Sequence, residues 1–383
     1  MTGRVAPGFE PVAAAFEETL AGSRGGAALA AVVDGEEVVD LWGGYADDEG
    51  RRPWAGDTVQ LVFSGTKGLV AVCLLLLLER GALHLDDPVA RYWPELAAAG
   101  KEGVLVRHVV SHTAGLPGIE VPFTTADLMD GDRMVAQLVG QAPLWEPGGT
   151  LAYHALTFGW LCGELLRRVD GRTIGAFFAE EVARPLGLDL WIGLPPELEP
   201  RVATLRPRDD FGITFLGDEP EPLLEAVYGT ARGGDFDTWN EPALHRAEIP
   251  AANAIGTARS IARLYGCLAR GGELDGLRLL APETALLGRT ELARATCAVT
   301  RRPYAFGVGF ELQTELDALG PPPDAFGHTG SGGSRHGAWP SHRVGFSYAM
   351  TELRPETDDD RGRRALVALH EAVRAQVERP DRK

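Results

Sequence analysis

The sequence predicts an α+β fold of the α/β sandwich type, in which helices flank an antiparallel sheet built from both ends of the chain and a mostly helical domain is inserted between those ends. Two β-rich segments near the N-terminus, two more near the C-terminus and helical patterns between them support this class. With 383 residues, 45% of them hydrophobic, the chain can bury a large core. We expect residues 1–85 and 250–383 to form the α/β domain and residues 86–249 to form the helical domain.

The N-terminal part is expected to contain a helix followed by a hairpin. Apolar side chains recur at helical spacing over residues 11–21, and glycines end that pattern. Residues 27–33 and 37–42 are rich in strand-forming side chains, and the Asp34-Gly35 pair between them is a strong hairpin signal. We therefore expect two paired antiparallel strands here.

Helical patterns dominate the middle of the chain, and an apolar stripe over residues 151–169 predicts a long helix there. Residues 195–250 are rich in proline and acidic residues and show no clear period. Because long irregular stretches in compact domains commonly cover functional sites, we assign this segment as a lid. The remaining expected elements are a helix over residues 257–268, strands over 326–338 and 343–353, and a closing helix over 365–377.

Charge and targeting signals limit the possible partners. Acidic residues outnumber basic ones by 54 to 37, and the net charge of -17 argues against nucleic-acid binding. The N-terminus lacks the apolar core of a signal peptide, and no segment reaches the roughly 18 apolar residues that a membrane span requires. We expect a cytoplasmic protein that acts on a small molecule, without a nucleic-acid or membrane partner.

The cysteines and histidines give no sign of a metal centre. None of the four cysteines belongs to a Cys-x-x-Cys pair, which favours buried, reduced thiols. These residues are Cys73, Cys162, Cys267 and Cys297. The nine histidines show no metal-ligand spacing such as His-Glu-x-x-His, so we expect neither a metal nor a cofactor.

Ser64 and Lys67 are the first catalytic candidates. They lie three residues apart at the start of a helical run, which places both side chains on one face. A serine hydroxyl becomes a useful nucleophile when a neighbouring base removes its proton, and burial of a lysine lowers its pKa toward that task. The alternative is that Ser64 only caps the helix.

Two further segments could complete a site with Ser64 and Lys67. Tyr153 follows a proline-glycine turn, and a phenol near a lysine ammonium can ionise more readily and serve as a base. Residues 327–333 read Gly-His-Thr-Gly-Ser-Gly-Gly, which indicates a close approach of the backbone to another group. His112, in the segment 111–117, is most simply a residue that fixes the turn at a helix end.

These motifs, in this order, resemble the serine β-lactamase and penicillin-binding protein superfamily, and within it the class C-like branch that contains the family VIII carboxylesterases. The resemblance covers nearly the whole chain, from residue 27 to the final helix. It implies that Ser64 is the acyl-accepting nucleophile and that Lys67 and Tyr153 share the base and acid roles. It also implies an oxyanion hole formed by the backbone N–H groups of Ser64 and Ser331.

The resemblance further implies substrate contacts from the segment after residue 327. We expect His328, Thr329 and Gly330 to line the substrate site, and we add Trp339 as a substrate-binding candidate. The alternative for His328 is that it only replaces the lysine as a polar group at the end of a strand. The neighbouring His336 and His342 could line the cleft or lie at a solvent-facing edge. His154 is expected to be a helix-surface residue or a residue behind the site.

Two departures from the β-lactamase pattern point toward neutral esters. His328 replaces the lysine of the Lys-Thr-Gly motif, so a permanent cation is exchanged for a group that is neutral much of the time near pH 7. Ala155 stands where class C β-lactamases carry the asparagine of Tyr-x-Asn. Both changes remove groups that would bind the carboxylate or the acylamide of a β-lactam.

The expected function is therefore that of a serine hydrolase, a carboxylesterase that cleaves esters through a covalent acyl-Ser64 intermediate. An acyltransferase or transesterase would use the same intermediate and pass the acyl group to an alcohol or amine. Residual β-lactamase or D-peptidase activity is a further alternative. A noncatalytic binding module that keeps the fold is the alternative from a different class, although such a module has no need of Ser64, Lys67 and Tyr153 together.

Overall fold

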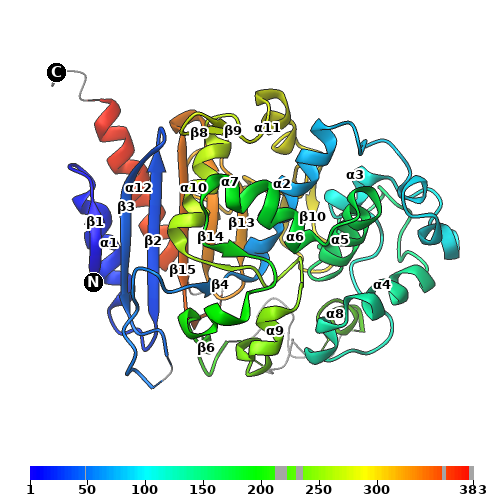
Figure 1. Cartoon of the computed structure of the whole chain (residues 1–383), viewed down its shortest axis with the longest axis horizontal. Helices are drawn as coiled ribbons and strands as arrows, with labels where there is room; N and C mark the ends of the chain where they lie inside the picture. Colours follow the sequence, from blue (N-terminus) through cyan, green and yellow to red (C-terminus); the bar gives the residue numbers. More distant parts are fainter. Residues whose placement is uncertain (48, 212–221, 230–235, 356–358, 379–383) are drawn as a thin grey trace.

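A nine-stranded antiparallel sheet forms the centre of the part of the chain that the computed structural model describes, residues 1–47, 49–211, 222–229, 236–355 and 359–378 (Figure 1). The strand order is β1-β3-β2-β15-β14-β13-β12-β11-β10. These strands are β1 (Thr2–Val5), β2 (Gly26–Val33), β3 (Glu36–Gly44), β10 (Ala293–Thr296), β11 (Pro303–Phe306), β12 (Glu311–Leu312), β13 (Phe326–Gly330), β14 (Ser334–Trp339) and β15 (Val344–Met350).

The two ends of the chain meet in this sheet, as the sequence predicted. β2 and β3 form the expected N-terminal hairpin, and β2 also pairs with β15, with Leu29 opposite Tyr348. The sheet therefore depends on pairing between the first and the last parts of the chain. The α+β fold class is confirmed.

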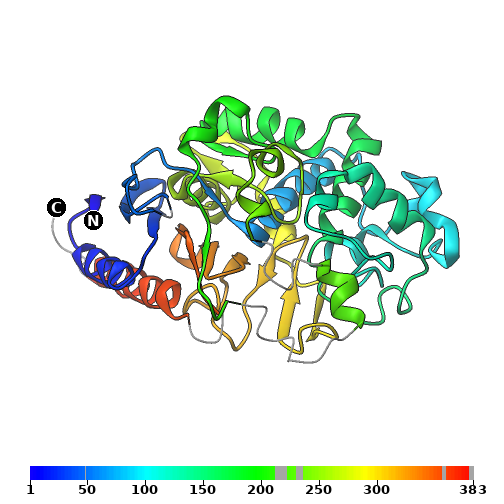
Figure 2. The same cartoon turned by 90° about the horizontal axis from the view of Figure 1, so that it is seen from below.

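Helices cover both faces of the sheet. α1 (Glu10–Leu20) and α12 (Arg361–Val377) lie side by side on one face, and α10 (Ala258–Ala269) packs on the other (Figure 2). The packing of α10 is close, because any side chain at Gly345 of β15 would collide with the backbone of Gly266. Glycine at these positions lets the helix approach the sheet.

The remaining helices gather mainly beyond one end of the sheet, on the right of Figure 1. They are α2 (Thr66–Glu79), α3 (Val106–Val110), α4 (Gly131–Gly140), α5 (Thr157–Asp170), α6 (Ile174–Phe178), α7 (Arg184–Leu186), α8 (Pro222–Tyr228), α9 (Pro242–Arg246) and α11 (Pro282–Gly288). Small sheets join β4 (Gln60–Leu61) and β5 (Leu190–Trp191) to β7 (Ile255–Gly256), β6 (Arg206–Pro207) to β16 (Glu352–Leu353), and β8 (Glu273–Leu274) to β9 (Leu277–Arg278). The division into two domains stays a prediction.

Two predicted elements differ from the structure. The single strand expected over residues 326–338 is a hairpin of β13 and β14, because Gly332 and Gly333 have φ values of +82° and +118° and reverse the chain. The helix expected from residue 151 begins only at Thr157. Strands β1, β10, β11 and β12 were not predicted, since they are short and carry little alternation.

The four cysteines are all free and buried, as expected. Three of them lie in helices α2, α5 and α10, where they pack as small apolar side chains. Across the described ranges, no helix combines the length and the apolar character needed to cross a membrane.

Candidate active site

Ser64 and Lys67 lie together at the N-terminal end of the buried helix α2. A short 3-10 turn, Phe63–Gly65, carries Ser64 and leads directly into α2, where every residue from Thr66 to Leu77 is buried. Lys67 Nζ lies 3.1 Å from Ser64 Oγ. Phe63 has a φ of +46°, a value that non-glycine residues rarely adopt. Strained backbone of this kind is found preferentially at functional sites.

Lys67 is completely buried and is surrounded by carbonyl groups. Its amine donates hydrogen bonds to the carbonyl oxygens of Ala155 and Ala251, at 2.8 and 2.9 Å. Burial lowers the pKa of Lys67 well below its usual value, and the neighbouring Cys162 and Glu311 only partly offset this effect. With Ser64 Oγ as its third acceptor, the protonated amine uses all three of its hydrogens. When the amine loses a proton, the two carbonyl groups can keep its remaining hydrogens and leave its lone pair for the Ser64 hydroxyl.

Tyr153 approaches the same pair from the irregular segment before α5. Its phenol faces the Ser64 side chain closely enough to affect the pKa of the phenol, and its ring centroid is 5.0 Å from Lys67 Nζ. Burial raises the pKa of Tyr153 well above its usual value, although the Ser64 side chain lowers it. This corrects the expectation that the nearby lysine would make the phenol ionise readily: desolvation determines the direction of the pKa shift, and the phenol is protonated at neutral pH.

His328, Thr329 and Gly330 form the last part of β13. The imidazole of His328 is buried with its centroid 6.1 Å from that of Tyr153, and burial lowers the pKa of His328 to about 3. It is therefore neutral at physiological pH. Both the N–H and the hydroxyl of Thr329 donate to Glu311 Oε2, each at 3.0 Å. A side chain at Gly330 would collide with the Val62 carbonyl, which brings β13 next to the turn that holds Ser64.

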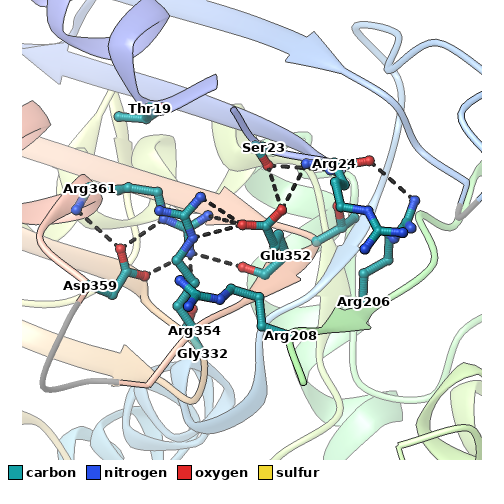
Figure 3. Close-up of polar contacts among 12 residues, drawn as sticks. Thr19, Ser23, Arg24, Arg206, Arg208, Gly332, Glu352, Arg354, Asp359 and Arg361 are labelled. Atoms are coloured by element: carbon teal, nitrogen blue, oxygen red, sulfur yellow. Dashed lines mark hydrogen bonds and ion pairs between the residues drawn. The ribbon is translucent and has the colours of Figure 1, made fainter. Parts of the chain in front are cut away.

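A buried ionic network supports the turn of residues 331–333, which we call the β13–β14 turn (Figure 3). Arg361 binds Asp359 through two hydrogen bonds of 2.7 and 2.8 Å, and also donates to the carbonyl oxygens of Glu352 and Gly332, at 2.9 and 3.5 Å. The Arg354 N–H donates to the same Gly332 oxygen at 3.3 Å. This network fixes the carbonyl group of Gly332, the residue after Ser331.

Comparison with known proteins identifies the family to which this chain belongs. The model of the Beta-lactamase family matches residues 12–371. The chain belongs to the Beta-lactamase family.

Individual relatives of this Beta-lactamase family member are similar over nearly the whole chain. The "Esterase/beta-lactamase LipL" of Mycobacterium tuberculosis is 39% identical over 92% of this chain and 82% of its own. A crystal structure of a family VIII carboxylesterase superposes with a TM-score of 0.90 at 37% identity, covering 97% of this chain and 99% of that one. A penicillin-binding protein homologue from Caulobacter crescentus gives a TM-score of 0.89 at 38% identity, with the same two coverages.

These findings confirm the resemblance stated from the sequence. They also confirm the enzyme class, a serine hydrolase of the β-lactamase type or a related acyltransferase. In this Beta-lactamase family member, the structure brings together Ser64, Lys67, Tyr153 and the end of β13. Their individual catalytic roles belong to the proposal below.

Trp339 lies apart from these residues. It occupies the far end of β14, where its indole N–H donates to the Leu319 carbonyl at 2.8 Å and its ring packs against Phe346 and His370 of α12. Its side chain is fully buried on the sheet face that α12 covers. The structure therefore places Trp339 in the core, and we do not include it in the proposed substrate site.

The expected lid is only partly described, because residues 212–221 and 230–235 lie outside the described residues. The described parts do approach the site. The Trp239 ring lies 5.1 Å from that of Phe63, beside Ser64. Leu224 and Val227 of α8 belong to the same buried apolar cluster as Tyr153. These contacts are consistent with a substrate-covering segment, which stays a proposal.

Two residues near the site were underestimated from the sequence. Glu311, which binds Thr329, was not identified; the available signal was a lone acidic residue in the apolar run of residues 306–312. His336 is fully buried and packs on Gly65, next to Ser64, while its Nδ1 is 2.8 Å from Ser347 Oγ. His342 instead lies at the exposed turn after β14, hydrogen bonded to Ser341.

Proposed function

We propose that this enzyme hydrolyses small, uncharged carboxylic esters through an acyl-Ser64 intermediate. The observation that carries the proposal is the position of Ser64 Oγ between the buried amine of Lys67 and the phenol of Tyr153. A nucleophile placed between a base and an acid is the arrangement that acyl transfer requires. The family relatives whose names include esterase or carboxylesterase support the choice of substrate class.

In the first half-reaction, the Lys67 lone pair takes the proton of Ser64 as Oγ attacks the ester carbonyl carbon. Lys67 suits this first step because burial lowers its pKa, whereas burial keeps Tyr153 protonated. The negative charge then grows on the carbonyl oxygen, where the N–H groups of Ser64 and Ser331 would hold it. Tyr153 donates its proton to the departing alkoxide and regains one from Lys67, so the alcohol leaves neutral.

In the second half-reaction, water attacks the acyl-Ser64 carbonyl. One proton of that water passes to the Tyr153–Lys67 pair, and a proton from the pair returns to Ser64 Oγ as the carboxylic acid leaves. Each proton taken in one half-reaction is returned, so no cofactor is needed to balance the cycle.

The preference for uncharged esters rests on His328. A neutral imidazole in place of a lysine gives a substrate carboxylate no permanent cation to pair with at this position. An acyl group bound near Tyr153 would meet the apolar cluster that contains Leu224, Val227 and Phe306. Apolar acyl groups fit such a surface.

The test is to incubate the enzyme with p-nitrophenyl butyrate and to follow both nitrophenol release and the mass of the protein. We expect steady turnover and a butyryl adduct on Ser64, with both absent in Ser64→Ala. The exposed serine variant Ser341→Ala is the matched control and should keep full activity. Absence of any adduct in the wild-type enzyme would refute the proposal and favour a noncatalytic binding module.

The same experiment separates hydrolysis from acyl transfer. It is repeated with added alcohols and amines as acceptors. A hydrolase releases butyrate at the same rate without them, whereas an acyltransferase accumulates acyl-enzyme until an acceptor is added. A β-lactam substrate tested in parallel should be turned over far more slowly than the ester.

The cytoplasmic location and the absence of a nucleic-acid partner stay predictions.

A further inference from the structure

His112, a residue of a distant turn, binds two backbone groups in the segment that carries Tyr153. The Ala152 N–H donates to the carbonyl oxygen of His112 at 3.0 Å, and the His154 N–H donates to His112 Nδ1, also at 3.0 Å. The Tyr153 N–H itself donates to Cys297 Sγ at 3.2 Å. His112 therefore binds the backbone N–H groups of the residues before and after Tyr153. The segment bound in this way is not helical, and α5 starts only at Thr157.

The imidazole of His112 is fixed in position by aromatic rings. Its centroid lies 4.2 Å from that of Phe306 and 5.0 Å from those of Phe158 and Tyr153. The side chain is fully buried. A ring enclosed in this way has little freedom to rotate, so the direction of its Nδ1 lone pair is set by packing.

The protonation state of His112 agrees with this role. Burial, and to a smaller extent the nearby His154, Lys67 and His328, lower the pKa of His112 well below its usual value. The ring is therefore neutral, and because Nδ1 accepts a hydrogen bond, the proton lies on Nε2. The backbone also suits this residue, since His112 has a φ of +61°, where histidine and asparagine are enriched among non-glycine residues.

We propose that His112 is a positioning residue for the reaction of Ser64: its Nδ1 and its carbonyl oxygen fix the backbone on both sides of Tyr153 and so hold the phenol within hydrogen-bond reach of Ser64. The inference rests on the proposed function, because it requires that Tyr153 takes part in acylation. His112 acts through Tyr153 and not on the ester. A displacement of about 1 Å in a catalytic group can slow a reaction roughly a hundredfold.

Two substitutions distinguish the role of the Nδ1 acceptor of His112 from the role of its ring in packing. His112→Asn places an amide oxygen close to the position of Nδ1 and tolerates the positive φ, but it removes the ring. His112→Phe keeps the ring packing and removes the acceptor. We expect His112→Phe to lower the kcat for p-nitrophenyl butyrate about a hundredfold with little change in KM, and His112→Asn to recover most of that loss.

The matched variant His112→Gly guards against misfolding of His112→Phe. Glycine tolerates the same φ and also lacks the ring, so His112→Gly and His112→Asn differ mainly in the acceptor. The asparagine variant should acylate Ser64 at least tenfold faster than the glycine variant, by the single-turnover mass of the protein. Equal acylation rates in the two variants would overturn the inference.

A double-mutant cycle shows whether His112 acts through Tyr153. In a Tyr153→Phe background, adding His112→Phe should slow acylation by less than twofold, because the group that His112 positions is already gone. If His112 had a purely structural role, His112→Phe would slow acylation by the same factor in the wild-type and the Tyr153→Phe enzymes, and it would lower the melting temperature of both. That result would overturn the inference.

Failure of the inference can be told apart from failure of the proposed function. If Tyr153→Phe acylates as fast as the wild-type enzyme, the role proposed for Tyr153 is wrong, and the His112 inference falls with it. If Tyr153→Phe is inactive but His112→Phe has the wild-type kcat, only the His112 inference is wrong.

Discussion

The imidazole of His336 packs directly on Gly65, the residue after the candidate nucleophile Ser64. A methyl group at Gly65 would lie 2.5 Å from His336 Cδ2 and 3.0 Å from Nε2. Both elements are constrained, since Gly65 ends the turn that carries Ser64 and His336 is fully buried in β14. The contact therefore couples the position of Ser64 to the sheet.

Gly65→Ala should destabilise the protein and slow acylation together. We expect a loss of about 1–3 kcal/mol in the free energy of unfolding, because overpacking a rigid contact forces side chains or backbone to move. Urea unfolding and p-nitrophenyl butyrate turnover measure the two effects. Gly140→Ala is the control, since nothing lies within 4 Å of a methyl group there. A Gly65→Ala variant as stable as the wild type would contradict the described contact.

The rate of ester cleavage should depend on the ionisation of Lys67. Because only the neutral amine can take the Ser64 proton, kcat/KM should fall as pH drops through the pKa of Lys67 in the folded enzyme. Burial lowers that pKa well below 10.5, so the rate should level off well below that pH. The profile of kcat/KM against pH checks this. Lys67→Arg, which stays protonated, should be inactive throughout; a rate that levels off only near pH 10.5 would exclude Lys67 as the first base.

His328→Lys should shift the substrate preference toward carboxylate-bearing substrates. A charge-assisted hydrogen bond contributes about 1.5–3 kcal/mol, so the kcat/KM for a carboxylate-bearing β-lactam relative to that for p-nitrophenyl butyrate should rise about tenfold or more. His328→Asn is the neutral control and should leave this ratio near the wild-type value. An unchanged ratio in His328→Lys would show that charge at this position does not determine the preference.

Removing Arg361 should be costly because it leaves Asp359 buried without its partner. Arg361→Met is expected to lower the free energy of unfolding by about 3–5 kcal/mol, the usual consequence of breaking a buried ion pair on one side. Arg364→Met, in the same helix but exposed, should change it by about 0–1 kcal/mol. Chemical denaturation of both variants gives the comparison. Similar small losses in both would argue against the network of Figure 3.

The buried histidines should make the protein sensitive to mild acid. Burial lowers the pKa of His154 to about 4 and those of His328 and His336 to about 3, from an ordinary value of 6.5. Below pH 6.5 the unfolded chain binds protons that the folded protein does not. The free energy of unfolding therefore decreases as the pH is lowered, by about 1.4 kcal/mol per pH unit for each such group.

Urea unfolding at pH 7, 6 and 5 measures this loss, in a range above the ordinary titration of carboxylates. Replacing one buried histidine, as in His336→Gln, should reduce the slope of stability against pH. The exposed variant His84→Gln should not change it. Equal slopes of stability against pH in the wild type, His336→Gln and His84→Gln would contradict the lowered pKa of His336.

Much of the fold and the core of the site could be predicted from the sequence because the signals are local. The Ser64-x-x-Lys67 spacing at a helix start fixes two groups on one helical turn, and the Asp34-Gly35 hairpin fixes a strand pair. The prediction of a helix from residue 151 was wrong for residues 151–156, where residues distant in the sequence, His112 and Cys297, bind the amides of residues 152–154. The expectation that Trp339 binds substrate was wrong for a similar reason, because the alternation of side chains along a strand does not show which face of the sheet a distant helix covers.

The sequence by itself determined the chemistry available: a hydroxyl, an amine, a phenol and a neutral imidazole in motifs of fixed local spacing. Only the tertiary structure decided how these groups behave, because a pKa depends on burial and on neighbours that are distant in the chain. Burial makes Lys67 the better base and keeps Tyr153 protonated, and these two residues meet Ser64 only after the helical segments and the sheet have packed together.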